Sequence, residues 1–182
     1  MNGKSLRTFV AYVEDKPGVL NRVASLFRRR NYNIVSLNVG RTHEVGVSRM
    51  TFVVEADDDM APRIEANLYK MVNVLSVEDI TKTARVSRDL AMVKVRAAPN
   101  QRAEVMQLCQ VFRGHVVDVG ADTLIVEVTG TQEKIEGLLT VLEPFGVIEM
   151  VHAGTVAMTR GGSSEAASAA HQKPASGTIA AA

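Results

Sequence analysis

A Pro-Gly turn at positions 17 and 18 separates two segments of the chain that have different hydrophobic periods. Residues 6–13, before the turn, are rich in branched and aromatic side chains, as strands are. After the turn, apolar residues recur at the spacing of one helical face, at Val19, Leu20, Val23, Leu26 and Phe27. The sequence therefore predicts a strand, a tight turn and an amphipathic helix over 19–30.

The same kinds of segment continue to residue 81. Three further strands and one helix are expected, the strands at 34–40, 49–56 and 74–81 and the helix at 62–72. This order predicts an antiparallel sheet covered by two helices on one face, which is the ferredoxin-like βαββαβ arrangement. One face and the edges of such a sheet stay uncovered, so a unit of this size is expected to dimerise.

The order repeats from residue 90. Strands are expected at 90–96, 115–119, 123–129 and 147–159, and helices at 101–112 and 132–143. The predicted fold class is therefore α+β, with two ferredoxin-like units at 1–81 and 89–160 joined by a linker at 82–88. Residues 161–182 are dominated by Gly, Ser and Ala without an apolar period, and we expect this tail to be disordered.

The Pro-Gly turn also has the chemistry of a small-molecule site. Gly18 has no side chain and lies where the first N–H groups of a helix are unpaired, so a carboxylate can approach these donors and the positive end of the helix dipole. Asp15 can face an ammonium group. A free α-amino acid carries both charges, but a plain surface turn has the same residues, and spacing alone does not separate the two interpretations.

Composition narrows the class of protein. The 182 residues carry a formal net charge of +1, which gives no long-range attraction to nucleic acid or to an anionic membrane. The basic cluster at 28–30 is expected to be a solvated helix end, and contact with a partner protein is the alternative.

Cys109 is the single cysteine and lies on an apolar helix face, which predicts a buried thiol. With no signal-like or membrane-spanning apolar run, we expect a cytoplasmic protein.

The sequence offers no catalytic constellation. It has no Gly-rich phosphate loop, and its four histidines lack the short spacings of a zinc site. The acidic run at 57–59 precedes Pro62 and is interpreted as a helix cap, not as a metal site. We therefore expect a regulator, with no catalytic residue, no metal site and no cofactor bound by this chain.

Specific segments resemble known families. Residues 14–20 (EDKPGVL) and 31–34 (NYNI) closely resemble an ACT domain, a ligand-binding regulatory module. Further segments are similar to the small, regulatory subunit of acetolactate synthase (acetohydroxyacid synthase), and this resemblance runs from Leu6 to Gly161. These segments are Ser36-Leu37, Ser48-Arg49-Met50-Thr51, Phe112-Arg113-Gly114, Val117-Asp118-Val119, Thr129-Gly130 and Arg160-Gly161.

The resemblance implies two groups of functional residues. In the family an amino-acid effector, usually valine, binds where the first domains of two chains meet. The matching effector residues are Asp15, Gly18, Val19, Asn33, Ile34 and Gly40. An apolar wall is expected from Val35, Leu37 or Val39, depending on the phase of the strand. The residues expected to contact the large subunit are Arg41, His43, Ser48 and Arg49.

The resemblance also implies partners. The expected partner is the large, catalytic subunit, which joins two pyruvates to acetolactate and CO2 and carries thiamine diphosphate, Mg²⁺ and FAD. Asp15 departs from the family pattern, because valine-sensitive bacterial relatives typically carry Asn there, and its effect on affinity can have either sign. The rival interpretations are a free-standing amino-acid sensor that regulates another enzyme or a transcription factor, and a self-sufficient enzyme with an unrecognised site.

Overall fold

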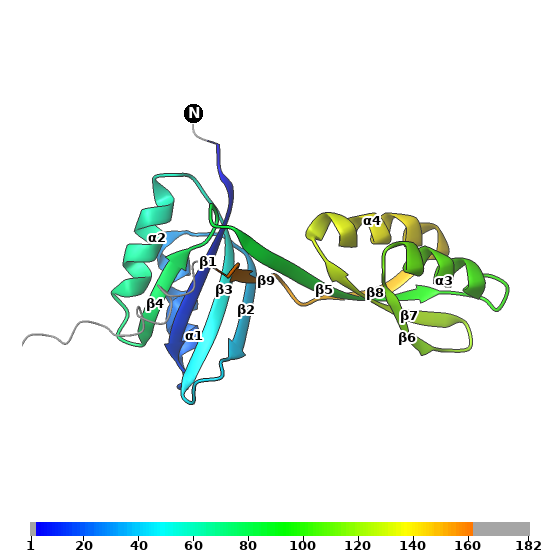
Figure 1. Cartoon of the computed structure of the whole chain (residues 1–182), viewed down its shortest axis with the longest axis horizontal. Helices are drawn as coiled ribbons and strands as arrows, with labels where there is room; N and C mark the ends of the chain where they lie inside the picture. Colours follow the sequence, from blue (N-terminus) through cyan, green and yellow to red (C-terminus); the bar gives the residue numbers. More distant parts are fainter. Residues whose placement is uncertain (1–2, 162–182) are drawn as a thin grey trace, which may run out of the picture. The chain divides into compact units, whose positions relative to one another are not determined.

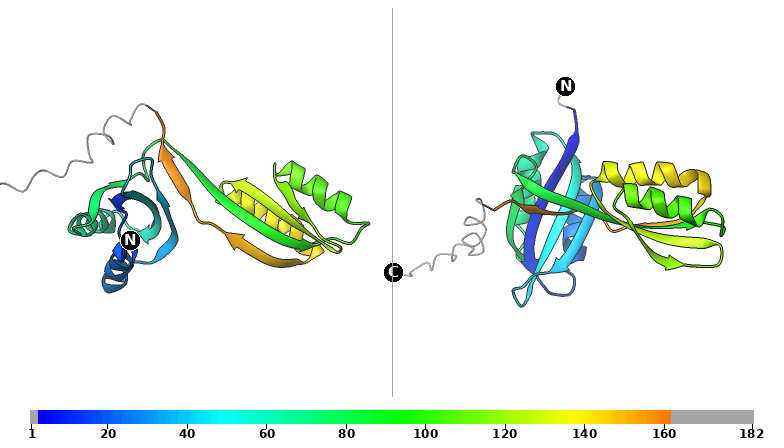
Figure 2. Two further views of the ribbon diagram at one scale, coloured as in Figure 1. Left: turned by 90° about the horizontal axis from the view of Figure 1, so that it is seen from below. Right: turned by 45° about the vertical axis from the view of Figure 1, so that its right-hand side comes forward.

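The computed structural model describes residues 3–161, which form two compact units. One unit runs up to Val86 and also includes the described residues from Ala157 onward, and the other is Ser87–Val156. The two helices of each unit cover one face of that unit's own sheet (Figures 1 and 2). The α+β class with two ferredoxin-like units is confirmed. The predicted disordered tail lies, apart from Gly161, outside the described residues.

The first unit follows the predicted βαββαβ order. Its elements are β1 (Ser5–Glu14), α1 (Val19–Arg30), β2 (Ile34–Arg41), β3 (Val47–Ala56), α2 (Met60–Tyr69) and β4 (Val74–Asp79). The antiparallel sheet has the strand order β2-β3-β1-β4, so β2 and β4 are its edges in this unit. Strand β3 pairs along its whole length with β1, which makes these two strands the frame of the unit.

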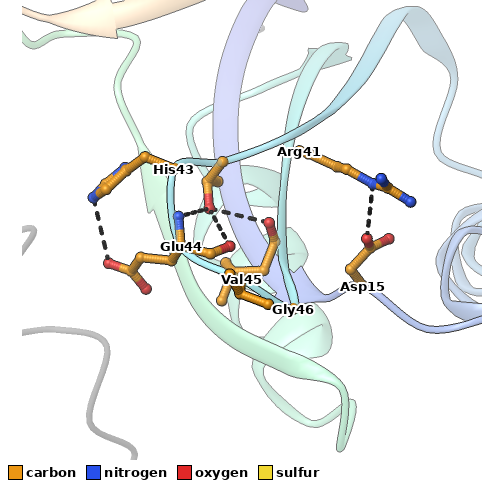
Figure 3. Close-up of a pocket in the computed structure, with 8 residues that line it drawn as sticks. Asp15, Arg41, His43, Glu44, Val45 and Gly46 are labelled. Carbon is orange, nitrogen blue, oxygen red and sulfur yellow. Dashed lines mark hydrogen bonds and ion pairs between the residues drawn. The ribbon is translucent and has the colours of Figure 1, made fainter.

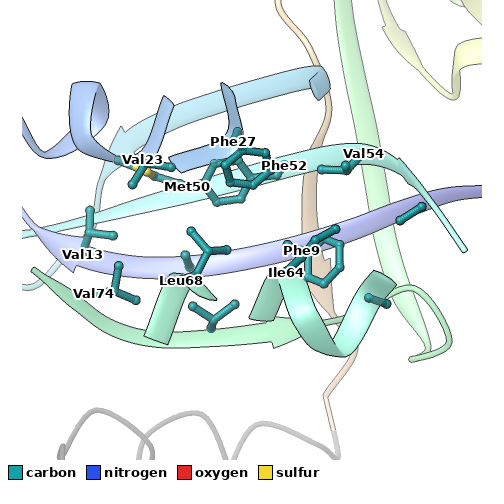
Figure 4. Packing of buried hydrophobic residues seen from close by; sticks show 14 of the residues in the cluster. Phe9, Val13, Val23, Phe27, Met50, Phe52, Val54, Ile64, Leu68 and Val74 are labelled. Carbon is teal, nitrogen blue, oxygen red and sulfur yellow. The ribbon is translucent and has the colours of Figure 1, made fainter. Parts of the chain in front are cut away.

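Helix α1 packs on this sheet through one face (Figure 4). Val23 and Phe27 are buried, and the ring of Phe27 stacks on Phe52 of β3 with a centroid separation of 5.3 Å. Leu20, which the periodicity placed on the same face, is instead 44% exposed. Helix α2 starts two residues earlier than predicted. The expected cap is confirmed, because the carboxylate of Asp57 accepts a hydrogen bond from the backbone N–H of Met60 (2.7 Å).

The second face of this sheet is partly covered by the chain itself, which corrects the expectation of an open face. The strand predicted over 147–159 is two strands, β8 (Val147–His152) and β9 (Val156–Thr159), with Gly154 at a positive φ of 78° between them. Strand β9 pairs with β5 (Arg85–Arg96), and its buried Ala157 packs against Val10 and Ile80. Because side chains alternate along β1, Val10 faces β9 while its neighbours face the helices.

Strand β5 begins inside the predicted linker. Its first residue, Arg85, donates a hydrogen bond to the carbonyl of Ile80 (3.0 Å) and another to that of Thr81. Arg85 is thus tied back to the end of the first unit, within the range predicted as the linker.

The second unit has the same topology. Its remaining elements are α3 (Arg102–Val111), β6 (His115–Val119), β7 (Thr123–Gly130), α4 (Gln132–Leu142) and the 3-10 turn η1 (Glu143–Phe145), and its main strand order is β6-β7-β5-β8. Thr131 caps α4 by accepting a hydrogen bond from the N–H of Lys134. Cys109 is buried, as predicted, and burial raises the pKa of its thiol.

One carboxylate at the start of α2 is held by two cations. The guanidinium of Arg7, which is almost fully buried, donates to Asp58 and also lies 3.5 Å from a carboxylate oxygen of Asp79. The hydrogen bond from Arg7, followed by the nearby charge of Lys82, keeps the pKa of Asp58 below its ordinary value. This pairing ties the N-terminal half of β1 to the segment before α2.

The packing of β9 predicts a position-specific loss of stability. Ala157→Asp should lower the free energy of unfolding by about 2 kcal/mol, because a carboxyl group enters the apolar contact with Val10 and Ile80. The matched control is Met158→Asp on the same strand, whose side chain is exposed, and we expect it to stay within about 0.5 kcal/mol of the wild type. Urea unfolding followed by circular dichroism measures both. Equal stability of the two variants would contradict the packing.

Candidate functional site

The β1–α1 turn leaves the start of α1 open. Gly18 is the N-cap residue with φ 82°, a left-handed conformation that a residue with a Cβ adopts only under strain. No side-chain hydrogen bond caps this helix, and no acidic residue lies in its first turn. The N–H of Val19 donates to the carbonyl of Lys16 (3.3 Å), so the donors of the first turn beyond Val19 and the positive end of the dipole are available to an external anion.

Asp15 sits beside this helix start and belongs to a pocket of about 380 Å³ (Figure 3). Its backbone N–H donates to the carbonyl of Gly46 (2.8 Å), which fixes the turn against the β2–β3 hairpin. Its carboxylate lies 3.1 Å from Nε of Arg41. The hairpin at 41–47 supplies the rest of the lining and is closed by Thr42, whose hydroxyl donates to the carbonyl of Val47 (3.0 Å).

This pocket presents groups of both charges, because the carboxylates of Asp15 and Glu44 and the guanidinium of Arg41 line it. The carboxylate of Asp15 suits an ammonium, and the guanidinium of Arg41 suits a carboxylate. Both side chains are at least a third exposed, at 36% for Asp15 and 86% for Arg41, so their mutual ion pair contributes little and can be exchanged for a ligand. The arrangement can hold a zwitterion without any metal or cofactor.

Asn33 lies far from this pocket within one chain. The backbone carbonyl of Asn33 accepts a hydrogen bond from the N–H of Glu55, at the far end of β3, whereas Asp15 is bonded to Gly46 just before β3 begins. At the rise of a strand the two positions are roughly 30 Å apart. Ile34 shares the far end with Asn33, while Gly18 and Gly40 share the end that holds Asp15.

The remaining predicted effector residues differ in how accessible they are. Val19 is buried in the core under α1, so its side chain does not face a ligand. Ile34 is half-buried and packs on the same core, as does Leu37. Val35 and Val39 are 50% and 41% exposed, which makes these two strand residues the available apolar wall.

The residues predicted to contact the large subunit divide in the same way. Arg41 and His43 present almost their whole side chains to solvent. Ser48 is buried, and Arg49 is half-buried beneath β9. The guanidinium of Arg49 donates to the carbonyl of Ala157 and lies 5.9 Å from the ring centre of Tyr12, so internal contacts already account for it.

Neither a metal cluster nor a membrane span is found in residues 3–161. These residues contain no group of three His, Cys, Asp or Glu side chains arranged to hold a metal ion. None of their helices is long and apolar enough to cross a bilayer.

Two features of the site have little signal in the sequence. Arg41 and Asp15 are far apart along the chain, and only the register of β2, β3 and β1 brings them together. The return of β9 to the first unit likewise depends on a pairing that no local pattern encodes. The sequence hints at the contact between Asp15 and Arg41 only by placing a basic residue directly after the strand predicted at 34–40.

Two family models of known proteins match most of the described chain. Residues 9–76 match the family model of an AHAS small subunit-like ACT domain. The ACT domain is the class of module that the sheet and the β1–α1 turn define. Residues 88–161 match the model described as the small subunit of acetolactate synthase.

Curated relatives cover nearly the same length. The acetolactate synthase small subunit of Mycolicibacterium smegmatis is 46% identical over 160 residues, which are 88% of this chain and 94% of that protein. That of Bacillus subtilis is 43% identical over 89% of this chain and 95% of its own length. The crystal structure of the acetolactate synthase small subunit from Thermotoga maritima matches with a TM-score of 0.80 and 36% identity, covering 86% of this chain and 98% of that one. The chain belongs to the acetolactate synthase small subunit family.

The turn conformation predicts a difference between two glycines. Gly18→Ala should cost about 1 kcal/mol of stability, because the new Cβ must adopt a positive φ although the space around it is open. Gly40→Ala, in a strand with equally open space and no positive φ, is the control and should be neutral or slightly stabilising. Urea unfolding of both variants measures this difference. A loss in Gly40→Ala as large as that in Gly18→Ala would contradict the assigned turn.

Proposed function

We propose that this chain is the regulatory subunit that binds the thiamine-diphosphate-dependent large subunit of acetolactate synthase, raises its activity, and transmits the binding of valine or a related branched-chain amino acid as feedback inhibition. Membership of the small subunit family supports the partnership. The observation that carries the effector site is the separation of Asp15 and Asn33 at the two ends of β3, because a site that uses both residues needs two chains.

Strand β2 offers a way to bring the two ends together. It is an edge of the first sheet and carries two exposed valines, Val35 and Val39. If two copies meet along β2 in antiparallel orientation about a two-fold axis, the start of one strand lies beside the end of the other. Asn33 of the second copy is then on the same side as Gly40 and Arg41 of the first. The proposed homodimer thus forms through the ACT units and contains two equivalent sites.

In the proposed site, different groups of the protein bind the ammonium and the carboxylate of the amino acid. Asp15 accepts from the ammonium, and the N–H groups of the first turn of α1 beyond Val19, with Arg41, bind the carboxylate. Asn33 of the second copy both donates and accepts, which suits either end of a zwitterion. The branched side chain packs on the exposed valines of β2. A carboxylate at position 15 forms an ion pair with the ammonium, whereas the neutral Asn of relatives only accepts a hydrogen bond from it.

Regulation follows from a ligand that contacts both chains. Such a ligand favours one relative orientation of the two first units, and coupling of this kind is typically worth about 1–3 kcal/mol. The hairpin at 41–47 lines the pocket and also presents Arg41 and His43 to solvent. It is therefore the proposed contact with the large subunit, which supplies thiamine diphosphate, Mg²⁺ and FAD and carries out the condensation of two pyruvates.

Heterodimers of binding-deficient variants test the two-chain site. Asp15→Ala and Asn33→Ala should each abolish valine binding by the homodimer. A heterodimer of one Asp15→Ala chain and one Asn33→Ala chain, purified through two different tags, should bind one valine, because one of its two sites then has both residues. Isothermal titration calorimetry gives the stoichiometry, with leucine and isoleucine as parallel ligands.

The matched control is the heterodimer of a wild-type chain with an Asp15→Ala/Asn33→Ala chain. A two-chain site leaves this heterodimer without an intact site, so it should bind no valine. Binding in this control, together with none in the first heterodimer, would place Asp15 and Asn33 in one site within a single chain and contradict the proposal.

A further inference from the structure

The tip of the β2–β3 hairpin carries an apolar side chain that does not contribute to the core. Val45 is 102% exposed, which makes it the most exposed large apolar residue within the described range 3–161. Turn positions usually hold Gly, Pro, Asn, Asp or Ser, because these residues permit or satisfy the backbone of a turn. A β-branched residue gives a turn neither benefit. Neither turn chemistry nor packing therefore explains a valine at this position.

The backbone that carries Val45 is fixed on both sides. The hydroxyl of Thr42 accepts from the N–H of Glu44 (3.1 Å), and the N–H of Thr42 donates to the carbonyl of Val47 (3.0 Å). The N–H of Val47 donates in turn to the carbonyl of Glu44 (3.3 Å). Because these hydrogen bonds close the loop before and after Val45, an ordered backbone holds this side chain in solvent.

Gly46 connects the tip to the rest of the first unit. Its φ is 80°, a conformation that glycine adopts without strain. Its carbonyl accepts a hydrogen bond from the backbone N–H of Asp15 (2.8 Å). The exposed valine is thus the direct neighbour of a residue that is bonded to the β1–α1 turn, and a displacement of that turn is expected to move the tip.

Polar side chains flank the tip (Figure 3). Arg41 and His43 are largely exposed, and Glu44 is about half exposed. An apolar residue among polar neighbours is the arrangement of an interface hot spot, in which the polar residues exclude water from the central contact. Valine suits this role, since its single and restricted side-chain torsion leaves little entropy to lose on binding.

We propose that Val45 is the apolar anchor of this chain on the large subunit of acetolactate synthase, and that it inserts into an apolar pocket of that partner. The inference rests on the proposed regulatory function and narrows its contact from a hairpin to one side chain. A preformed loop presents the anchor at a low ordering cost. Because Gly46 follows Val45 and is bonded to the β1–α1 turn, an amino acid bound at that turn acts on the anchor through the backbone.

Isothermal titration calorimetry of the full chain against the cognate large subunit, without valine, tests the anchor. Val45→Ser should weaken association by about tenfold or more, because the contact loses its branched apolar side chain. The matched control is Val72→Ser, which alters a similarly exposed valine (78%) of the same unit outside the hairpin. This control should change the affinity less than about twofold.

A fluorescent label at the same two positions gives a readout that does not depend on affinity. Cys109 is the single cysteine and is buried, so Val45→Cys and Val72→Cys each add one accessible thiol. A polarity-sensitive dye at position 45 should shift its emission to shorter wavelength when saturating large subunit is added. The same dye at position 72 should not shift.

The outcomes separate this inference from the function on which it rests. Equal affinities of the wild type and Val45→Ser for the large subunit would overturn the anchor and leave the proposed function intact. A shift at position 45 that grows with the concentration of this chain alone would overturn the anchor in favour of a contact between two copies. Absence of association by the wild-type chain would contradict the proposed function and the anchor together.

Discussion

The length of strand β3 is the constraint on which the functional account depends. It pairs with β1 on one side and β2 on the other. The β1–α1 turn, with Asp15, lies beside one end of β3, and Asn33 lies beside the other end. A sheet is rigid along its strands, so no local rearrangement joins residues that lie roughly 30 Å apart. The proposed amino-acid site therefore belongs to a dimer, and the relative orientation of two chains becomes the quantity that a ligand can change.

Local chemistry decides which end of the sheet receives the charged part of the ligand. The positive φ of Gly18 opens the start of α1, and the absence of an acidic residue in the first helical turn leaves its dipole unpaired. Asp15, in the turn after β1, and Arg41, at the end of β2, meet beside it. These groups are exposed, which keeps their ion pair weak and exchangeable, whereas the ion pair of the buried Arg7 serves the fold.

Much of the fold could be predicted from the sequence because the periods are clear. The helix at 19–30 and the strand at 115–119 begin and end at the predicted residues, since turn residues flank segments of strong periodicity. The return of β9 could not be predicted, because Ala157 has no apolar period of its own and its burial depends on Val10 and Ile80 far away in sequence. The exposure of Leu20 and the burial of Ser48 have the same origin, since long-range packing and not local spacing decides which side of an element meets the core.

Acetolactate formation by the cognate large subunit, measured alone and with added wild-type chain across a valine titration, tests the central claim most directly. The account predicts that the added chain raises the rate and that valine reverses this activation. A rate that the added chain leaves unchanged at every ratio of the two subunits would contradict the proposed regulatory role and favour a free-standing amino-acid sensor.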